Sequence, residues 1–153
     1  MKTAKVITFR RRKIDLNFGR PPGYTAFVKS HITIWLTAFN LDETIASHAA
    51  EVMGCLSDEA RDDLLNDPAF RMMDYDPTPG MMTHIPVAAP RAKSAGRSVL
   101  LKRTLRHRPA PFVRWVIAHE LAHAHLRNAG RWPGEDPEHA ADALAAQWGF
   151  PRP

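Results

Sequence analysis

The chain has 153 residues, 44% of them hydrophobic, and a formal net charge of +5, a size that suits one compact domain. Its single cysteine, Cys55, excludes an intramolecular disulfide and a cysteine-rich zinc ribbon. The longest apolar run, residues 31–39, is too short to span a membrane. Because no apolar segment follows the basic N-terminal residues, they do not resemble a secretory signal, and we expect a cytoplasmic protein.

Charge is unevenly distributed along the chain. Residues 1–20 carry a net +6, residues 42–76 a net −8, and residues 91–131 a net +9. Opposed blocks of this kind either face each other in the fold or form separate solvated surfaces. The overall charge alone therefore does not indicate a nucleic-acid-binding protein.

The first basic block is predicted to be an arm, residues 1–20, that precedes a single domain over residues 21–153. A short basic run at its centre is a candidate nucleic-acid contact, although such runs are weak motifs. Its members are Arg10, Arg11, Arg12 and Lys13.

The domain begins with an ambiguous segment and a helix. Residues 33–39 are rich in β-branched and aromatic side chains, which favours a strand or the start of a helix. Asn40, with Glu43 three residues later, is typical of a capping box. Apolar residues at helical spacing then predict an amphipathic helix over 41–56, with Cys55 buried on its apolar face.

A second helix and two strands are expected next. Ser57 is predicted to cap an acidic helix that ends by Asp67 and presents its carboxylates to solvent. Residues 70–75 and 98–105 have strand character. The segment between them, 81–97, shows no clear period and is interpreted as a loop.

The next helix carries the strongest motif. Residues 112–126 are apolar on nearly all sides, which predicts a buried helix, yet they include HELAH at 119–123. Burying two histidines and a carboxylate without partners would cost several kcal/mol. Residues four apart share one face, so His119 and His123 can direct their imidazoles at one metal ion. Glu120 lies about 100° further around, within reach of a metal-bound water.

A final helix is predicted over 137–148, capped by Asp136 and with proline at its first position. Glu138 and Asp142 are four residues apart and share one face. A short connection favours antiparallel packing on the preceding helix, which would bring Glu138 to the two histidines. Two histidines and one carboxylate leave a fourth position for water, the pattern of catalytic zinc.

HELAH at 119–123 followed by EHAAD at 138–142 resembles the HExxH and ExxAD pair of the gluzincin metallopeptidases, over residues 112–150. The resemblance implies an α+β, zincin-like fold. In that fold a small mixed sheet has an edge strand before the buried HExxH helix, and a second helix carries a further ligand. Residues 98–105 fit the place of the edge strand.

The resemblance also implies a role for each matched residue. His119, His123 and Glu138 would ligate Zn²⁺. Glu120 would be the general base, and Asp142 would orient a ligand histidine from the second shell of the site.

Other candidates for the third ligand are weighed against Glu138. Glu135 and Asp136 are better explained by the turn and the helix cap, and His139 faces away from Asp142 by helix geometry. His125 lies roughly 200° around the helix from His123, so we expect a surface or locally bonded histidine.

The predicted activity is that of a soluble regulatory zinc metallopeptidase, hydrolysing peptide bonds with a zinc-activated water and Glu120 as general base. By family analogy, a protein or peptide substrate would lie along the 98–105 strand and pair with its backbone. The sequence leaves four candidates for the hydrogen-bond donor that stabilises the oxyanion. They are His84, His107, Tyr75 and an arginine from 91–108.

The size resembles that of small regulatory metallopeptidases of bacteria and mobile elements. SprT-like proteases are a variant of this interpretation that would use the basic arm. The alternative from another class is a non-catalytic, zinc-stabilised module that binds nucleic acid or protein. A third is a polar core cluster of His119, His123 and Glu138 without any metal.

Overall fold

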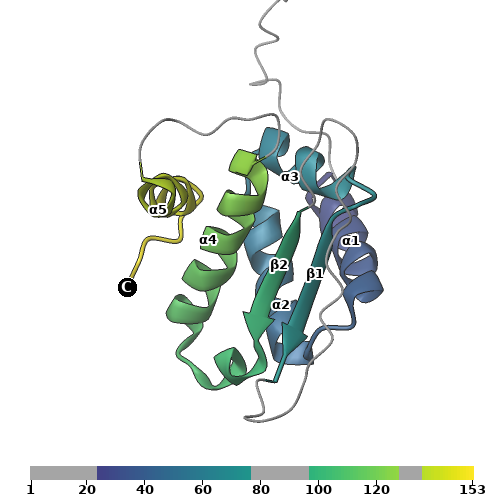
Figure 1. The fold of residues 1–153 in the computed structure, drawn as a ribbon. Coiled ribbons are helices and arrows are strands. Elements are labelled where there is room, and N and C mark those ends of the chain that lie inside the picture. The colour runs from purple at the N-terminus through teal and green to yellow at the C-terminus, as the bar shows by residue number, and fades with distance from the viewer. Residues whose placement is uncertain (1–23, 77–96, 128–135) are drawn as a thin grey trace, which may run out of the picture.

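The computed structural model describes residues 24–76, 97–127 and 136–153, which combine helices with a small sheet (Figure 1). The mixed helix-and-sheet class predicted from the sequence is confirmed. The predicted basic arm, the loop predicted up to residue 96, His84 and Glu135 lie outside the described residues.

The sheet consists of β1 (Arg71–Tyr75) and β2 (Ser98–Lys102), which pair in parallel with Met73 opposite Leu100. Within the described ranges it is purely parallel, where a mixed sheet was expected. The predicted strand at 98–105 is too long, because the chain turns after Lys102 into the 3₁₀ helix η2 (Arg103–His107). That turn buries Leu105.

The ambiguous N-terminal segment is helical. It forms α1 (Tyr24–Leu36) and the 3₁₀ helix η1 (Thr37–Phe39), so the strand interpretation of residues 33–39 is wrong. Ile32 and Leu36, four residues apart, are both buried in the core. The packing of one helical face therefore outweighs the weak strand preference of β-branched side chains.

The predicted helix over 41–56 is present as α2 (Glu43–Cys55), but its cap is Asp42 and not Asn40. The Asp42 carboxylate accepts a hydrogen bond of 3.0 Å from the backbone N–H of Thr44. Asn40 instead ends η1 in the left-handed region, with φ of 49°. An asparagine tolerates this conformation at small cost, so its turn-forming chemistry was mistaken for capping.

Cys55 is exposed, so the prediction of a buried cysteine is also wrong. It is the last residue of α2, where the apolar stripe has moved on to Leu56. The buried residues of α2 are Ile45, Ala49, Val52 and Met53.

The acidic helix α3 (Asp58–Leu65) begins and ends as predicted. The Ser57 hydroxyl accepts a hydrogen bond of 3.3 Å from the backbone N–H of Ala60. The helix stops two residues before Asp67. Its face toward the core carries Ala60 and Leu64, both fully buried.

The central helix is α4 (Ala110–Arg127), which contacts α2, α3, α5 and β2. Val113, Ile117 and Leu121 are fully buried along it. This confirms the prediction of a buried helix.

The last helix, α5 (Pro137–Gln147), packs against α4 through small buried residues, Ala141 and Ala145 among them. It starts at the Asp136 cap as predicted. Figure 1 looks almost along α5 while α4 runs up the picture, so the two helices cross steeply and are not antiparallel. The crossing places the first turns of α5 over one face of the second half of α4.

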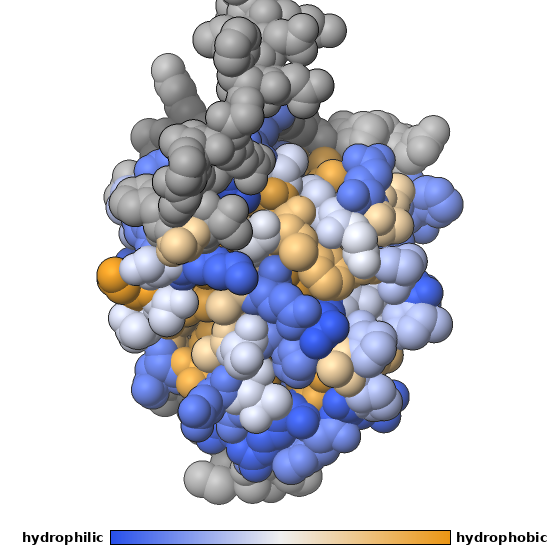
Figure 2. Space-filling view, turned by 180° about the vertical axis from the view of Figure 1, so that it is seen from behind, coloured by the Kyte–Doolittle hydropathy of each residue, from blue (hydrophilic) through white to orange (hydrophobic). Residues whose placement is uncertain are grey.

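Figure 2 shows the opposite side of the molecule, where α1 and α2 lie and hydrophilic side chains surround smaller apolar areas. Over the described ranges, no helix has the length and apolar character needed to cross a membrane.

Candidate metal centre

Three side chains from two helices converge at the crossing of α4 and α5. The Nε2 atoms of His119 and His123 lie 3.0 Å apart. The two carboxylate oxygens of Glu138 lie 3.1 Å from His119 Nε2 and 3.2 Å from His123 Nε2. All three residues thus offer a donor atom to one point, as the sequence predicted for their placement.

Asp142 lies behind this cluster and contacts the other ring nitrogen of His119. Its Oδ1 is 2.8 Å from His119 Nδ1 and accepts a second hydrogen bond of 3.1 Å from Trp115 Nε1. A carboxylate only accepts, so the proton is placed on His119 Nδ1. In the neutral ring, Nε2 then carries a lone pair that faces Glu138 and His123, as a metal-binding histidine requires.

The surroundings of Asp142 favour its ionised form. Burial raises the pKa of its carboxyl, but the hydrogen bonds from Trp115 and His119 lower it more, so the net pKa is below the ordinary value. Arg152 adds a positive charge 3.7 Å from Oδ2, and its guanidinium lies over the Trp115 ring at 5.1 Å.

Sequence reasoning missed Trp115 and Arg152. Trp115 was assigned only to the apolar surface of α4, although it precedes His119 by one helical turn and therefore shares its face. That spacing was the signal that could have found it. Arg152 lies after the last helix, and no sequence signal connects it with Asp142.

The three donors differ in exposure. The side chains of His119 and His123 are 12% and 10% exposed, whereas that of Glu138 is 69% exposed. Two ligand positions are thus held rigidly in the core, and the third lies at the surface. A small molecule can approach the cluster from the Glu138 side.

The remaining predicted residues are distributed as follows. Glu120 is half-buried on α4 and is not one of the three converging donors. Asp136 is occupied as the helix cap, accepting a hydrogen bond of 3.0 Å from the Glu138 backbone N–H. His139 is exposed. Among the candidate oxyanion donors, His107 is exposed and Tyr75 half-buried at the end of β1.

The donor set could hold a metal ion. The two histidine Nε2 atoms lie 3.0 Å apart, and Glu138 approaches them with different oxygens, Oε2 at 3.1 Å from His119 and Oε1 at 3.2 Å from His123. These contacts are short enough for hydrogen bonds, so either a proton on a histidine nitrogen or a metal ion can lie between the donors.

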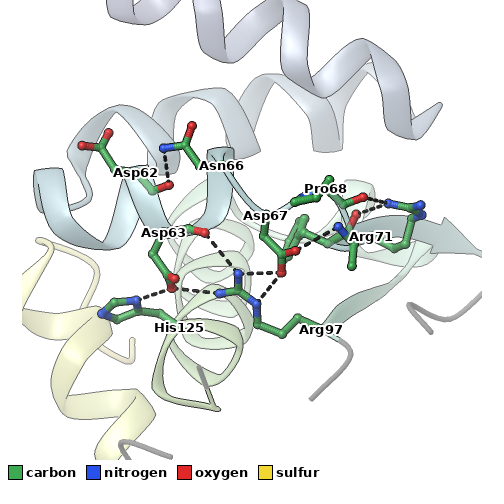
Figure 3. Close-up of polar contacts among 10 residues, drawn as sticks. Asp62, Asp63, Asn66, Asp67, Pro68, Arg71, Arg97 and His125 are labelled. Atoms are coloured by element: carbon green, nitrogen blue, oxygen red, sulfur yellow. Dashed lines mark hydrogen bonds and ion pairs between the residues drawn. The ribbon is translucent and has the colours of Figure 1, made fainter. Parts of the chain in front are cut away.

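A second polar cluster lies on the same helix, two residues after His123 (Figure 3). Asp63 on α3 accepts hydrogen bonds from His125 Nδ1, at 2.7 Å, and from Arg97 Nη1, at 2.8 Å. Arg97 also donates from Nε to Asp67 at 2.8 Å. His125 is therefore buried and bonded across the fold, contrary to the surface or local role expected for it.

This cluster also corrects the prediction that the acidic helix α3 presents its carboxylates only to solvent. Asp63 and Asp67 face inward to Arg97, whose side chain is 3% exposed. The pairing confirms that the opposed charge blocks face each other. Three further arginines of the second basic block pair with the acidic block, in the contacts Arg103–Asp74, Arg106–Asp42 and Arg114–Glu51.

No protein-family model, curated protein or solved structure matches this chain. The gluzincin resemblance therefore rests on the quoted motifs and on the geometry of the residues that carry them.

Proposed function

We propose that the protein is a zinc-dependent metallopeptidase, with His119, His123 and Glu138 as the metal ligands. The observation that supports it is that His119 Nε2 and His123 Nε2 lie 3.0 Å apart and each lies within 3.2 Å of a Glu138 carboxylate oxygen, while Asp142 contacts the far nitrogen of His119. A bound zinc ion supplies Lewis-acid polarisation of a carbonyl and a water whose pKa is lowered to about 7.

The helical positions around α4 support the role of Glu120. At 100° per residue, Trp115 lies about 40° to one side of His119, and Glu120 about 100° to the other. Trp115 and His119 both bond to Asp142, so α5 covers the first side. Glu120 therefore faces away from α5, where its carboxylate is free to take a proton from water attacking a substrate carbonyl.

Strand β2 lies on the same side as Glu120. Val116, about 60° from His119 in the direction of Glu120, lines a hollow together with Leu100 and Leu101 of β2. An extended peptide along this edge of β2 would pass the metal ligands and Glu120, which fits the expected substrate strand. Figure 1 shows β2 beside α4.

Metal analysis and one variant test this proposal. After loading with zinc and removal of excess, the wild-type protein should hold one zinc per chain. Glu120→Gln should keep that zinc but cleave fluorescein-labelled casein about 10²–10⁴-fold more slowly, the usual contribution of a general base. Glu43→Gln, an exposed glutamate at the start of α2, is the matched control and should cleave like wild type.

Each other outcome has a distinct meaning. Zinc without cleavage by wild type would favour the non-catalytic zinc module. Absence of zinc would favour a polar cluster of His119, His123 and Glu138 without any metal. Cleavage by Glu120→Gln at the wild-type rate would show the mechanism to be wrong.

A further inference from the structure

A hollow of about 390 Å³ lies between β2, the segment after it and the first half of α4. Its apolar lining includes Leu100, Phe112 and Val116. Leu100 is one of two large hydrophobic side chains exposed within the described residues, at 37%. An apolar lining open to solvent favours an apolar ligand.

The hollow is lined by residues of α4, the helix that carries His119 and His123. Phe112 and Val116 lie about 20° and 60° around α4 from His119, so they share the face of the two histidines. Glu120 follows Val116 by one turn, about 6 Å along the axis. A larger hollow of about 560 Å³, between α1 and α2, has no residue of α4 in its lining.

The rim of the hollow carries positive charge. Lys102 and Arg108 line it, and the Arg108 guanidinium lies over the Phe112 ring at 4.7 Å. Neither forms an ion pair with a carboxylate within the described ranges, in contrast with Arg103 and Arg106 on η2 between them. The charges of Lys102 and Arg108 are thus available to an acidic ligand.

From these contacts we propose that the hollow is the specificity pocket of the peptidase. It binds a bulky apolar side chain of an extended peptide, with an acidic residue next to it facing Lys102 and Arg108. This inference rests on the proposed function for its consequence in cleavage, but the binding itself does not require catalysis.

The test uses zinc-loaded Glu120→Gln protein and fluorescein-labelled decapeptides of glycine and serine that differ only at two central positions. By fluorescence polarisation, the Phe-Asp peptide should bind about tenfold more tightly than Ala-Asp, because Phe buries its ring. It should also bind several-fold more tightly than Phe-Lys, with the difference shrinking at high salt.

Two substitutions locate the binding. Leu100→Trp should fill the hollow and reduce Phe-Asp affinity to that of Ala-Asp. Arg108→Glu should reverse the preference for Phe-Asp over Phe-Lys. Ile34→Trp and Lys29→Glu are the matched controls, since both residues are exposed on α1 and away from the hollow. Circular dichroism of all four variants establishes that they are folded.

The proposal is overturned if the three peptides bind alike, if none binds, or if the controls act like the pocket variants. Its failure is distinguishable from that of the proposed function. Selective binding without any cleavage by wild type would contradict only the proposed peptidase activity. Cleavage without a Phe-Asp preference would contradict only the proposed specificity pocket.

Discussion

Helix α4 carries two histidine clusters within two turns of each other, and they are completed in different ways. In the first, His125 meets Asp63, and the guanidinium of Arg97 lies between the carboxylates. In the second, His119 and His123 meet Glu138, and no arginine or lysine of the described residues lies among the three donors. The first cluster has its cation built into the chain, whereas the second consists of two imidazoles and a carboxylate, a set that could hold a metal ion.

The difference separates a structural polar network from a site prepared for a ligand. A buried carboxylate is tolerated when a fixed positive charge and hydrogen bonds satisfy it. The Arg97 cluster meets this requirement and joins α3, the start of β2 and α4. In the His119 cluster no arginine or lysine of the described residues takes this place, and the Glu138 carboxylate is 69% exposed, so water can satisfy it when no metal ion is bound.

The largest expected effect comes from removing one histidine from each cluster. His119→Ala should abolish stoichiometric zinc binding, because it removes a ligand and leaves Asp142 without its partner ring. His125→Ala should still bind one zinc per chain, although it loses a hydrogen bond in the core. Metal content measured on both folded variants checks this, and equal zinc loss in both would erase the distinction between the clusters.

The next effect is on stability. Arg97→Met should destabilise the fold by about 3 kcal/mol, the lower end for breaking a buried ion pair, because it leaves the half-buried Asp63 and Asp67 without their shared cation. Urea unfolding of the metal-free protein measures this. Arg106→Met is the control, since the Arg106 side chain is 38% exposed where that of Arg97 is 3% exposed, and it should change little. A loss no greater for Arg97→Met than for the control would contradict the structural role of the cluster.

The smallest effect concerns Trp115. Trp115→Phe removes the hydrogen bond to Asp142 and should weaken zinc binding roughly tenfold. This is the lower end of the loss in metal affinity expected when a group that supports a metal ligand is replaced. Competition with a chelating dye measures it. Trp35→Phe, which alters a stack on Phe70 in the core, is the matched control and should leave zinc affinity unchanged.

The same variant should change the acid dependence of stability. The pKa of Asp142 lies below its unfolded value of about 3.9, so its contribution is present above that pH and is lost as the pH falls through the folded pKa. Without the Trp115 hydrogen bond that pKa rises toward the unfolded value. Metal-free Trp115→Phe should therefore lose less stability below pH 4 than the Trp35→Phe control.

Much of the fold follows from local signals. Ser57 and Asp136 mark helix starts through capping chemistry that acts within three residues. The segment over 33–39 was ambiguous between strand and helix because its β-branched residues have only a weak local preference, whereas burial of Ile32 and Leu36 decides its conformation. The steep crossing of α4 and α5 has no local signal in the sequence.

The residues of the candidate site differ in how far the sequence alone could predict them. His119, His123 and Glu138 occur at spacings that express their chemistry directly. Trp115 required knowing that Asp142 would reach the same helix face. The partner of His125, Asp63, comes 62 positions earlier in the chain, and Arg97, which pairs with Asp63, comes just before β2, so only the folded topology brings the three together.

Glu138 occupies the first turn of α5, and its exposed carboxylate is the outermost of the three donors. The two histidines belong to one buried helix and move as a unit. An ion would therefore enter and leave through the outer turn of α5, by the swing of a single side chain or the fraying of one helix end. Exchange of the metal would then be governed by the motion of that turn, without any opening of the core.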